Sequence, residues 1–315
     1  MINFRSKISH YDIPSLGNVL SSISRTICYV PAHHPVNQSD IGKLREFLLS
    51  HKSKTLVITG AGVSTESGIP DYRSKDVGLF ARSNHKPMTY QKFIESDAGR
   101  RRYWARSYVG WSSYSKISPN SVHRALKKLE DDDFISTIIT QNVDNLHKKC
   151  GSRNVIELHG TLFQVICLSC QNSLDRFEFQ KMLESLNPKF NVTPSMIRPD
   201  GDVDLPEEFV LSFNIPSCPK CDGILKPDVV FFGENVPLHR VKHIQRVVES
   251  STAVLVLGST LETFSSYRII LQARDLKVPV YMINIGPTRA DNLATFKVSA
   301  KCGEVFEHLL PKLQL

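Results

Sequence analysis

The sequence predicts an α/β fold in which a Rossmann-like parallel sheet carries a smaller, inserted zinc-binding module. Short apolar runs, such as residues 55–59 and 252–257, have the length of buried strands and alternate with amphipathic segments, as in parallel sheets covered by helices on both faces. Glycine or polar residues directly follow several of these runs, where such sheets bind ligands. Two Cys-x-x-Cys pairs interrupt the alternation between residues 167 and 221.

The helices and strands are assigned in order from the spacing of apolar side chains. The expected elements are a helix over residues 41–48, a strand at 55–59, a short helix at 64–66, helices around 104–111 and over 122–129, strands at 134–140 and 229–232, a helix over 241–248, a strand at 252–257, a helix over 264–274 and a strand at 278–283. Ser118 and Pro119 predict the N-cap and first turn of the helix over 122–129. Long loops are expected over residues 187–204, rich in Pro, Asn and Asp.

The alternation of strands and helices stops at the cysteine pairs and resumes after them. We therefore assign residues 29–160 and 226–315 to a Rossmann-type cofactor-binding domain and residues 161–225 to the zinc-binding module. Residues 1–28 precede both.

The composition is typical of a globular protein. Of the 315 residues, 41% are hydrophobic and 22% are charged, which excludes a disordered or fibrous chain. No stretch approaches the roughly 18 consecutive apolar residues that a membrane span needs. The net charge of +8 is not gathered into a dense Lys/Arg run with interleaved aromatics, so we expect neither a nucleic acid nor a membrane as partner. The sequence leaves the oligomeric state open.

Residues 1–28 have the traits of a mitochondrial transit peptide. They hold three basic residues, one acidic residue and six serines, and they lack the uninterrupted apolar core of a secretory signal. The segment therefore predicts a location in the mitochondrial matrix. An untargeted terminal segment is the alternative.

The two cysteine pairs predict a structural zinc site. Cys167 and Cys170 are separated from Cys218 and Cys221 by 47 residues, and each pair lies among turn-forming residues, as in tetrahedral Cys₄ sites. Four thiolates would leave the metal no open position for a substrate, so one structural zinc ion per chain is expected. A disulfide pair, a redox Cys-x-x-Cys and cysteines that merely pack are the alternatives.

The loop Gly60-Ala61-Gly62 predicts a site for an anionic cofactor. It follows a strand and precedes a short helix, so its backbone can approach a pyrophosphate and offer helix N-terminal amides. Taken alone, the same loop is equally compatible with a tight turn that binds nothing.

Four motifs together resemble the sirtuin family of NAD-dependent protein deacylases. They are the run 60–73, the run Gln141-Asn142-Val143-Asp144, Leu158-His159-Gly160 and the run 226–234, in the family's order and with the cysteine pairs in the family's place. The resemblance covers about residues 29–310. The runs 71–80, 102–106, 199–203 and 284–288 are most similar to a mitochondrial branch associated with lipoamidase, deacylase and ADP-ribosyltransferase activities.

The resemblance implies NAD as cofactor and assigns the site residue by residue. It makes His159 the base that takes a proton from a ribose hydroxyl, a role that suits an imidazole, and it puts Asn142 and Asp144 at the ribose and nicotinamide pocket as further catalytic residues. The implied cofactor contacts are Gly60, Ala61, Gly62, Asp71, Tyr72, Arg73, Gln141, Asn142, Val143, Asp144, Gly258, Ser259, Thr260, Asn284, Ile285, Gly286 and Cys302.

The resemblance also implies acyl-lysine proteins as substrates, bound as an added strand beside residues 229–233. A succinyl-preferring relative uses a Trp-x-x-Tyr-x-x-Arg arrangement in its acyl pocket, and an ungapped alignment places Trp104, Ser107 and Gly110 there in this chain. The phenol and guanidinium are missing, so a short acidic acyl group is disfavoured unless Arg102 or Arg106 reads it. Lipoyl or another non-acetyl acyl group on mitochondrial proteins is expected.

Two other functions are compatible with the same residues. ADP-ribose could pass to a protein side chain, which would make the chain a mono-ADP-ribosyltransferase. A non-catalytic, NAD-responsive zinc scaffold is the third possibility. The intact run 141–144 together with His159 argues against it, because a pure binder has no need of the base.

Overall fold

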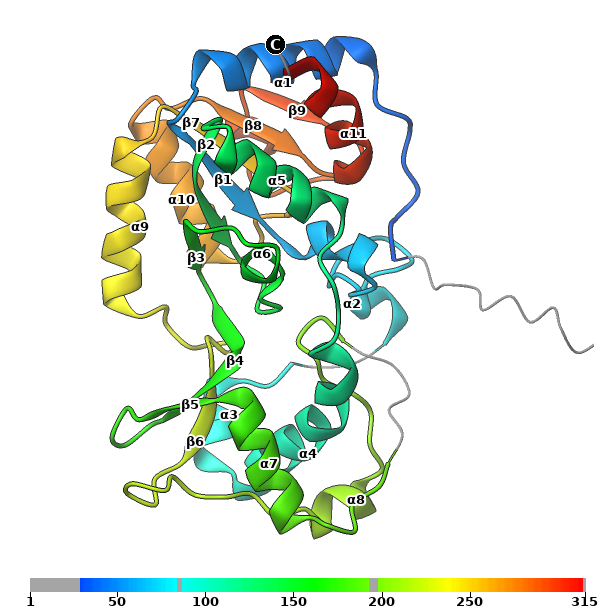
Figure 1. Ribbon diagram of the computed structural model, residues 1–315, viewed down its shortest axis with the longest axis vertical. Coiled ribbons are helices and arrows are strands. Elements are labelled where there is room, and N and C mark those ends of the chain that lie inside the picture. The colour runs from blue at the N-terminus through cyan, green and yellow to red at the C-terminus, as the bar shows by residue number, and fades with distance from the viewer. Residues whose placement is uncertain (1–28, 84–86, 193–197, 314–315) are drawn as a thin grey trace, which may run out of the picture.

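A six-stranded parallel sheet lies in the larger lobe of the chain, and a three-stranded antiparallel sheet lies in the smaller lobe (Figure 1). The computed structural model describes residues 29–83, 87–192 and 198–313, so the predicted transit peptide at 1–28 lies outside the described residues. The strands of the large sheet, in the spatial order β3-β2-β1-β7-β8-β9, are β1 Thr55–Thr59, β2 Ile135–Thr140, β3 Val155–Glu157, β7 Ala253–Leu257, β8 Val280–Ile283 and β9 Phe296–Val298. The predicted α/β fold is confirmed.

Helices cover both faces of the large sheet, because side chains alternate between the faces along each buried strand. In β1, Val57 packs with α1, α5 and α11, whereas Leu56 and Ile58 pack with α9 and α10 on the other face. Figure 1 shows α1 and α11 together at one end of the molecule and α9 along its side. These helices are α1 Gln38–Ser50, α5 Ser121–Asp131, α9 Leu238–Ser250, α10 Phe264–Asp275 and α11 Cys302–Leu313.

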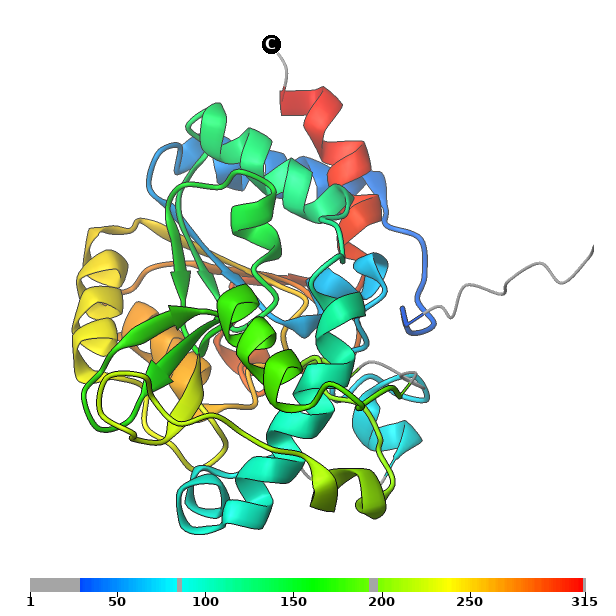
Figure 2. The same ribbon diagram turned by 60° about the horizontal axis from the view of Figure 1, so that its bottom comes forward.

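The smaller lobe combines the antiparallel sheet with four helices. Its elements are α3 Tyr90–Glu95, α4 Asp97–Tyr114, β4 Gly160–Cys167, β5 Ser173–Asp175, α7 Arg176–Leu186, α8 Glu207–Ser212 and β6 Leu225–Val229. β4 pairs with both β5 and β6, which makes β6 an edge strand. The core of this lobe is largely aromatic, with Phe93, Trp104, Phe179 and Phe213 fully buried, and Figure 2 shows α4 and α7 next to each other.

The remaining elements are short helices. They are η1 Ala61–Ser67, α2 Leu79–Arg82, α6 Leu146–Lys149 and η2 Asp291–Leu293. None of the helices within the described ranges is long and apolar enough to cross a membrane.

Two sequence expectations were wrong in local detail. Ser118 does not cap α5: the N-cap is Asn120, whose side chain accepts from Val122 and His123 and also donates to the carbonyl of Val63 in η1 at 2.8 Å. That tertiary hydrogen bond fixes the start of the helix two residues after the predicted cap. The strand expected at 229–232 ends at Val229 as β6 and belongs to the antiparallel sheet, because its partner is β4.

Candidate active site

A cavity of about 1950 Å³ lies at the carboxyl ends of the central parallel strands and is lined by residues of both lobes. The structure brings every catalytic and cofactor-binding residue that the sequence predicted to this cavity: Gly60, Ala61, Gly62, Asp71, Tyr72, Arg73, Gln141, Asn142, Val143, Asp144, His159, Gly258, Ser259, Thr260, Asn284, Ile285, Gly286 and Cys302. They come from seven separate stretches of sequence that meet because parallel strands end at one edge. Their individual roles remain predictions.

The floor of the cavity is a close approach of two backbone turns. The amide of Gly62 donates to the carbonyl of Gly258 at 2.9 Å. A Cβ atom at Gly62 would lie 2.8 Å from that oxygen, and one at Gly60 would lie 2.7 Å from it. Larger residues would push β1 and β7 apart at this point, so glycine leaves the backbone open to a ligand.

A chain of buried polar groups joins the end of β2 to η1. The amide of Asn142 donates to Ser64 Oγ at 3.0 Å, and Ser64 Oγ donates to Asp144 Oδ2 at 2.6 Å. The backbone amide of Leu146 donates to the other oxygen of Asp144 at 2.9 Å. Burial raises the pKa of Asp144, and the two hydrogen bonds partly offset that rise. The carboxyl group is therefore held in one orientation beside the cavity.

His159 lies where the chain passes from β3 in the large sheet to β4 in the small one. The following residue, Gly160, has φ +82°, and a Cβ there would lie 1.9 Å from the carbonyl oxygen of Asp228, so only glycine fits. This turn directs the partly buried imidazole into the cavity.

The hydrogen bonds of His159 define which ring nitrogen carries the proton. Nδ1 lies 3.0 Å from the carbonyl oxygen of Gln141, and Nε2 lies 2.8 Å from Ser265 Oγ. A carbonyl only accepts, so Nδ1 is protonated and Nε2 of the neutral ring carries the lone pair. Burial lowers the pKa of His159 to about 4, against the opposing effect of the Gln141 hydrogen bond. The ring is thus a neutral base at physiological pH.

The other predicted contacts surround this centre. Asp71 accepts from the backbone amides of Arg73 and Ser74, at 3.0 and 2.7 Å, which fixes the loop after η1. Gln141 donates its side-chain amide to Ser259 Oγ at 2.7 Å. Asn284 turns its amide toward the carbonyls of Ile285 and Gly286, and Cys302 is a buried thiol.

The four predicted metal ligands meet at the far end of β4. The Sγ atoms of Cys167 and Cys221 lie 3.5 Å apart, those of Cys170 and Cys218 lie 3.7 Å apart, and all four lie within 4.8 Å of one another. Bonds of about 2.3 Å to a tetrahedral zinc would place sulfurs about 3.8 Å apart, so the cluster fits that metal. Since β4 separates Cys167 from His159 by roughly 20 Å or more, such a metal cannot take part in chemistry at the cavity.

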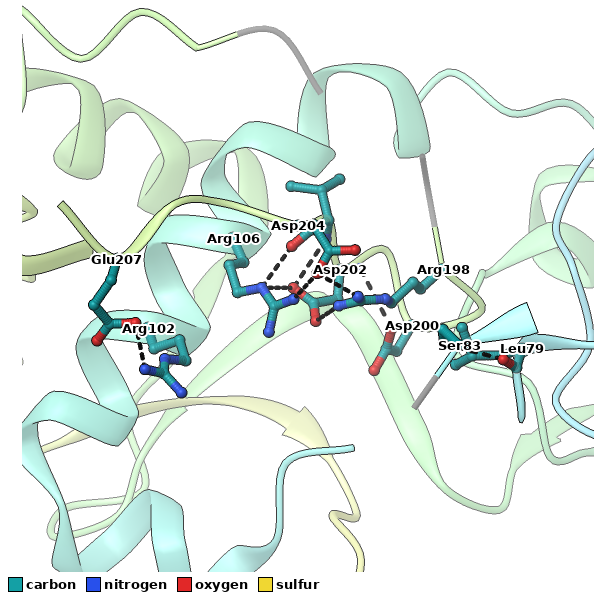
Figure 3. A network of polar contacts seen from close by, with 10 residues as sticks. Leu79, Ser83, Arg102, Arg106, Arg198, Asp200, Asp202, Asp204 and Glu207 are labelled. Carbon is teal, nitrogen blue, oxygen red and sulfur yellow. Dashed lines mark hydrogen bonds and ion pairs between the residues drawn. The ribbon is translucent and has the colours of Figure 1, made fainter. Parts of the chain in front are cut away.

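A charged turn at residues 198–204, whose polar contacts are drawn in Figure 3, contributes Pro199 and Asp200 to the lining of the cavity. The guanidinium of Arg198 pairs with Asp202 at 2.8 Å, and Arg106 from α4 pairs with Asp202 at 3.3 Å and with Asp204 at 2.7 Å. Asp200 of this turn lines the cavity, and burial raises the pKa of its carboxyl group. Burial and the neighbouring Asp200 raise the pKa of Asp202 to about 7.

The residues considered for acyl recognition lie elsewhere. Trp104 is 1% exposed and donates its indole N–H to the carbonyl of Leu225 at 3.1 Å, inside the core of the smaller lobe. Arg102 pairs with Glu207, and Arg106 is held by the turn at 198–204. In the described part of the chain, the aromatic side chain of α4 that does line the cavity is Tyr103.

Sequence reasoning missed three polar residues of this site. Ser64 connects Asn142 to Asp144, Asp200 faces the cavity from the charged turn, and Ser265 contacts the ring of His159. Ser64 falls inside the first motif, so its position could have identified it. No local pattern marks Ser265, which is distant in sequence from His159 and meets it only through the sheet topology.

Comparison with known proteins identifies the family. Residues 60–265 match the protein family described as the Sir2 family. The chain is 56% identical over 285 residues to the NAD-dependent protein deacylase Sirt4 of Drosophila melanogaster, covering 90% of each chain. It is 44% identical over 283 residues to the NAD-dependent protein lipoamidase sirtuin-4, mitochondrial, of Homo sapiens, again covering 90% of each. The chain belongs to the Sir2 family, and the expected similarity to a mitochondrial branch of the sirtuins is confirmed.

Solved structures agree with this assignment. A Sir2 structure with a p53 peptide and NAD+ superimposes with a TM-score of 0.68 at 27% identity, covering 86% of this chain and 97% of the other. A Sir2 structure bound to a propionylated peptide gives a TM-score of 0.65 at 28% identity, covering 86% and 98%.

Proposed function

We propose that this chain is an NAD-dependent protein lysine deacylase, which releases nicotinamide and forms O-acyl-ADP-ribose. The observation that carries the proposal is the neutral imidazole of His159, held beside Asn142 and Asp144 in one cavity. The names of the similar Drosophila and human proteins, a deacylase and a lipoamidase, support the same chemistry.

The residues of the cavity fit NAD. The approach of Gly60 and Gly62 to Gly258 keeps side chains out of the turn at the start of η1, so a pyrophosphate could come close to the backbone there. The polar chain from Asn142 to Asp144 suits the ribose and the leaving carboxamide. When bound, NAD would supply the ADP-ribosyl group that accepts the acyl chain. The remaining predicted contacts would line its adenosine and ribose moieties.

His159 is the proposed base. Its Nε2 lone pair accepts a hydrogen bond from Ser265, a hydroxyl that also lines the cavity, while the hydrogen bond from Nδ1 to Gln141 holds the ring plane. From this position the ring can take a proton from a ribose hydroxyl, and the positive charge it gains is then stabilised by the carbonyl of Gln141.

The substrate peptide is proposed to add as a strand to the exposed edge of β6, near residues 229–233, which line the cavity. For the acyl group we propose lipoyl or another non-acetyl chain without a carboxylate. Two facts support this preference. Arg102 and Arg106 are already paired with carboxylates, and the acidic residue Asp200 lines the cavity.

One assay tests the deacylase proposal and separates it from its alternative. Purified protein and NAD are offered a single peptide carrying acetyl, lipoyl, succinyl or 3-hydroxy-3-methylglutaryl lysine, and the products are identified by mass spectrometry. Free lysine with O-acyl-ADP-ribose supports the proposal. ADP-ribose left on protein, with the acyl group retained, would instead identify a mono-ADP-ribosyltransferase.

The pH dependence of the reaction should reflect the lowered pKa of His159. A base must be unprotonated, so activity is present above its pKa and is lost as the pH falls through it. With a pKa of about 4, kcat/KM should stay level as the pH is lowered from 8 to about 5.5. A fall in kcat/KM centred near pH 6.5, the usual value for an exposed histidine, would contradict this prediction.

We also propose that Cys167, Cys170, Cys218 and Cys221 hold one structural zinc ion. Two observations support this zinc site. The four sulfur positions fit a tetrahedral metal, and the length of β4 separates them from the cavity. Acyl-lysine proteins of the mitochondrial matrix are the proposed substrates. The name of the human relative places that protein in mitochondria.

Mitochondrial import can be tested with the N-terminal segment alone. A fusion of residues 1–28 to a fluorescent reporter should enter mitochondria and be shortened, because basic, serine-rich segments poor in acidic residues are read as transit peptides. Microscopy and a gel shift provide the measurement. A reporter that stays cytosolic at full length would remove the basis for the proposed location.

A further inference from the structure

Three hydroxyl groups at the start of α10 form a chain that ends on the ring of His159. Ser265 Oγ lies 2.8 Å from Nε2 of His159 and 3.3 Å from Oγ1 of Thr263. Oγ1 of Thr263 lies 2.8 Å from Oγ of Ser266, and that hydroxyl donates to the backbone carbonyl of Thr263 at 3.0 Å. The chain therefore runs from the proposed base to a fixed acceptor.

Thr263 is unusual for its position in the helix. It is the N-cap residue of α10, where a threonine side chain ordinarily accepts a hydrogen bond from a backbone amide of the first turn. Its side chain makes no capping hydrogen bond. The hydroxyl contacts Ser265 and Ser266 instead, so it can take part in the chain of hydrogen bonds.

The direction of the hydrogen bonds follows from the ring. Because Nδ1 of His159 donates to Gln141, the neutral ring has its lone pair on Nε2, and Ser265 must donate to it. When Ser265 turns its own hydrogen to Thr263, the lone pair of Nε2 becomes free to gain a proton, and the protonated ring then donates to the oxygen of Ser265. Thr263 then donates to Ser266. The hydroxyl of Ser266 donates to the backbone carbonyl of Thr263 whether the ring is neutral or protonated.

This reversible chain of hydrogen bonds lowers the electrostatic cost of protonating His159. The proposed base is partly buried and lies beside the first turn of α10, whose partial positive charge opposes a protonated ring. A hydroxyl oxygen that accepts from Nε2–H offsets this cost without adding a charge. An apolar side chain at residue 265 could not do so.

We propose that Ser265 is a positioning residue for His159: its hydroxyl holds Nε2 as the proton-accepting nitrogen and then accepts a hydrogen bond from the protonated ring. The inference rests on the proposed function, since it assumes that His159 is the base. Nε2 has one lone pair, so Ser265 first turns its hydrogen from Nε2 to Thr263 and frees that lone pair. The ribose hydroxyl then loses its proton, Nε2 gains it, and the new Nε2–H donates to the oxygen of Ser265; no other bond changes.

The test compares two substitutions of the same shape, Ser265→Val and Ser265→Thr, of which only the second keeps a hydroxyl. We expect Ser265→Val to lower kcat for acyl removal about tenfold, the loss expected for one neutral hydrogen bond. KM for NAD and the exchange of labelled nicotinamide into NAD should stay within about twofold, because exchange does not require the base. Ser265→Thr should restore kcat to within about threefold of wild type.

Other outcomes would overturn the inference. Equal kcat values for wild type and Ser265→Val would mean that the hydroxyl has no role. Equal losses in both variants would mean that residue 265 acts through its shape, and a parallel loss of nicotinamide exchange would assign Ser265 to an earlier step. Ser265→Ala replaces Ser265→Val if the thermal unfolding midpoint shows that the branched side chain disturbs the fold.

A second measurement does not depend on deacylation. In protein with ¹⁵N-labelled histidine, the imidazole signals of His159, assigned with the His159→Ala variant, should show protonated Nδ1 and hydrogen-bonded Nε2. In Ser265→Val, the Nε2 signal should move toward that of a free lone pair, and in Ser265→Thr it should not. An unchanged Nε2 signal would overturn the inference, whereas wild-type protein that removes no acyl group would overturn only the proposed function.

Discussion

Replacing His159 by alanine is expected to lower the rate of NAD-dependent acyl removal by roughly 100- to 10,000-fold, the range for loss of a positioned base. NAD should still bind within about threefold of wild type, because the ring acts on a ribose hydroxyl after the cofactor is seated and the glycines at residues 60, 62 and 258 are untouched. Nicotinamide exchange in the presence of acyl peptide should persist, since it precedes the step that needs the base. Deacylation assays and calorimetric titration with NAD provide the two measurements.

The matched control is His308→Ala, which removes an exposed histidine of α11 outside the cavity lining. It should leave the rate unchanged. Substantial residual acyl removal by His159→Ala would show that the ring is a packing histidine and that another group is the base. His159→Tyr should behave like His159→Ala, because a phenol at the same position has a pKa near 10 and is a poor proton acceptor at neutral pH.

Replacing Cys167 or Cys218 by serine should release zinc and unfold the smaller lobe. Structural zinc contributes free energy on the order of 10 kcal/mol in small modules, and both thiols are buried where β4 meets the loop before β6. The effect on NAD binding should be indirect, since the cluster lies a full strand away from the cavity. Elemental analysis gives the zinc content, and thermal unfolding gives the stability.

Cys150→Ser provides the control for this pair, because Cys150 is a half-buried thiol next to α6 and lies outside the four-cysteine cluster. It should retain one zinc ion per chain. Purified wild-type protein without zinc, or a Cys167→Ser variant with a full zinc content, would disprove the proposed site.

The strands and helices of the large sheet that carry clear periodicity were predictable from sequence, whereas β4 and α7 of the smaller lobe and the shortest strands were not. The apolar run of β1 and the helical spacing in α1 match the structure, since five to thirteen residues carry enough periodicity to define a strand or helix. β3 and β9 are three residues long, and their identity depends on pairing with β2 and β8. The N-cap of α5 depends on a contact with η1 that no local pattern encodes.

The candidate site, like the fold, was only partly predictable from sequence. The order of the motifs was enough to identify the residues that line the cavity, because glycines and polar residues at the carboxyl ends of parallel strands lie at one edge of the sheet. The ungapped alignment for the acyl pocket pointed to Trp104, which is buried in the smaller lobe and does not line the cavity. The adjacent Tyr103 belongs to the same core and also lines the cavity, because neighbouring residues on a helix differ by about 100° in direction.

The sequence by itself determined the fold class, the family resemblance, the candidate base and the two cysteine pairs, because each is marked by short motifs or by the local spacing of apolar residues. Only the tertiary structure decided the state and surroundings of those groups. His159 has a lowered pKa because two lobes bury it, and its tautomer follows from the carbonyl of Gln141 and the hydroxyl of Ser265. Burial and hydrogen bonding between distant segments depend on how strands and helices pack, and local sequence does not specify them.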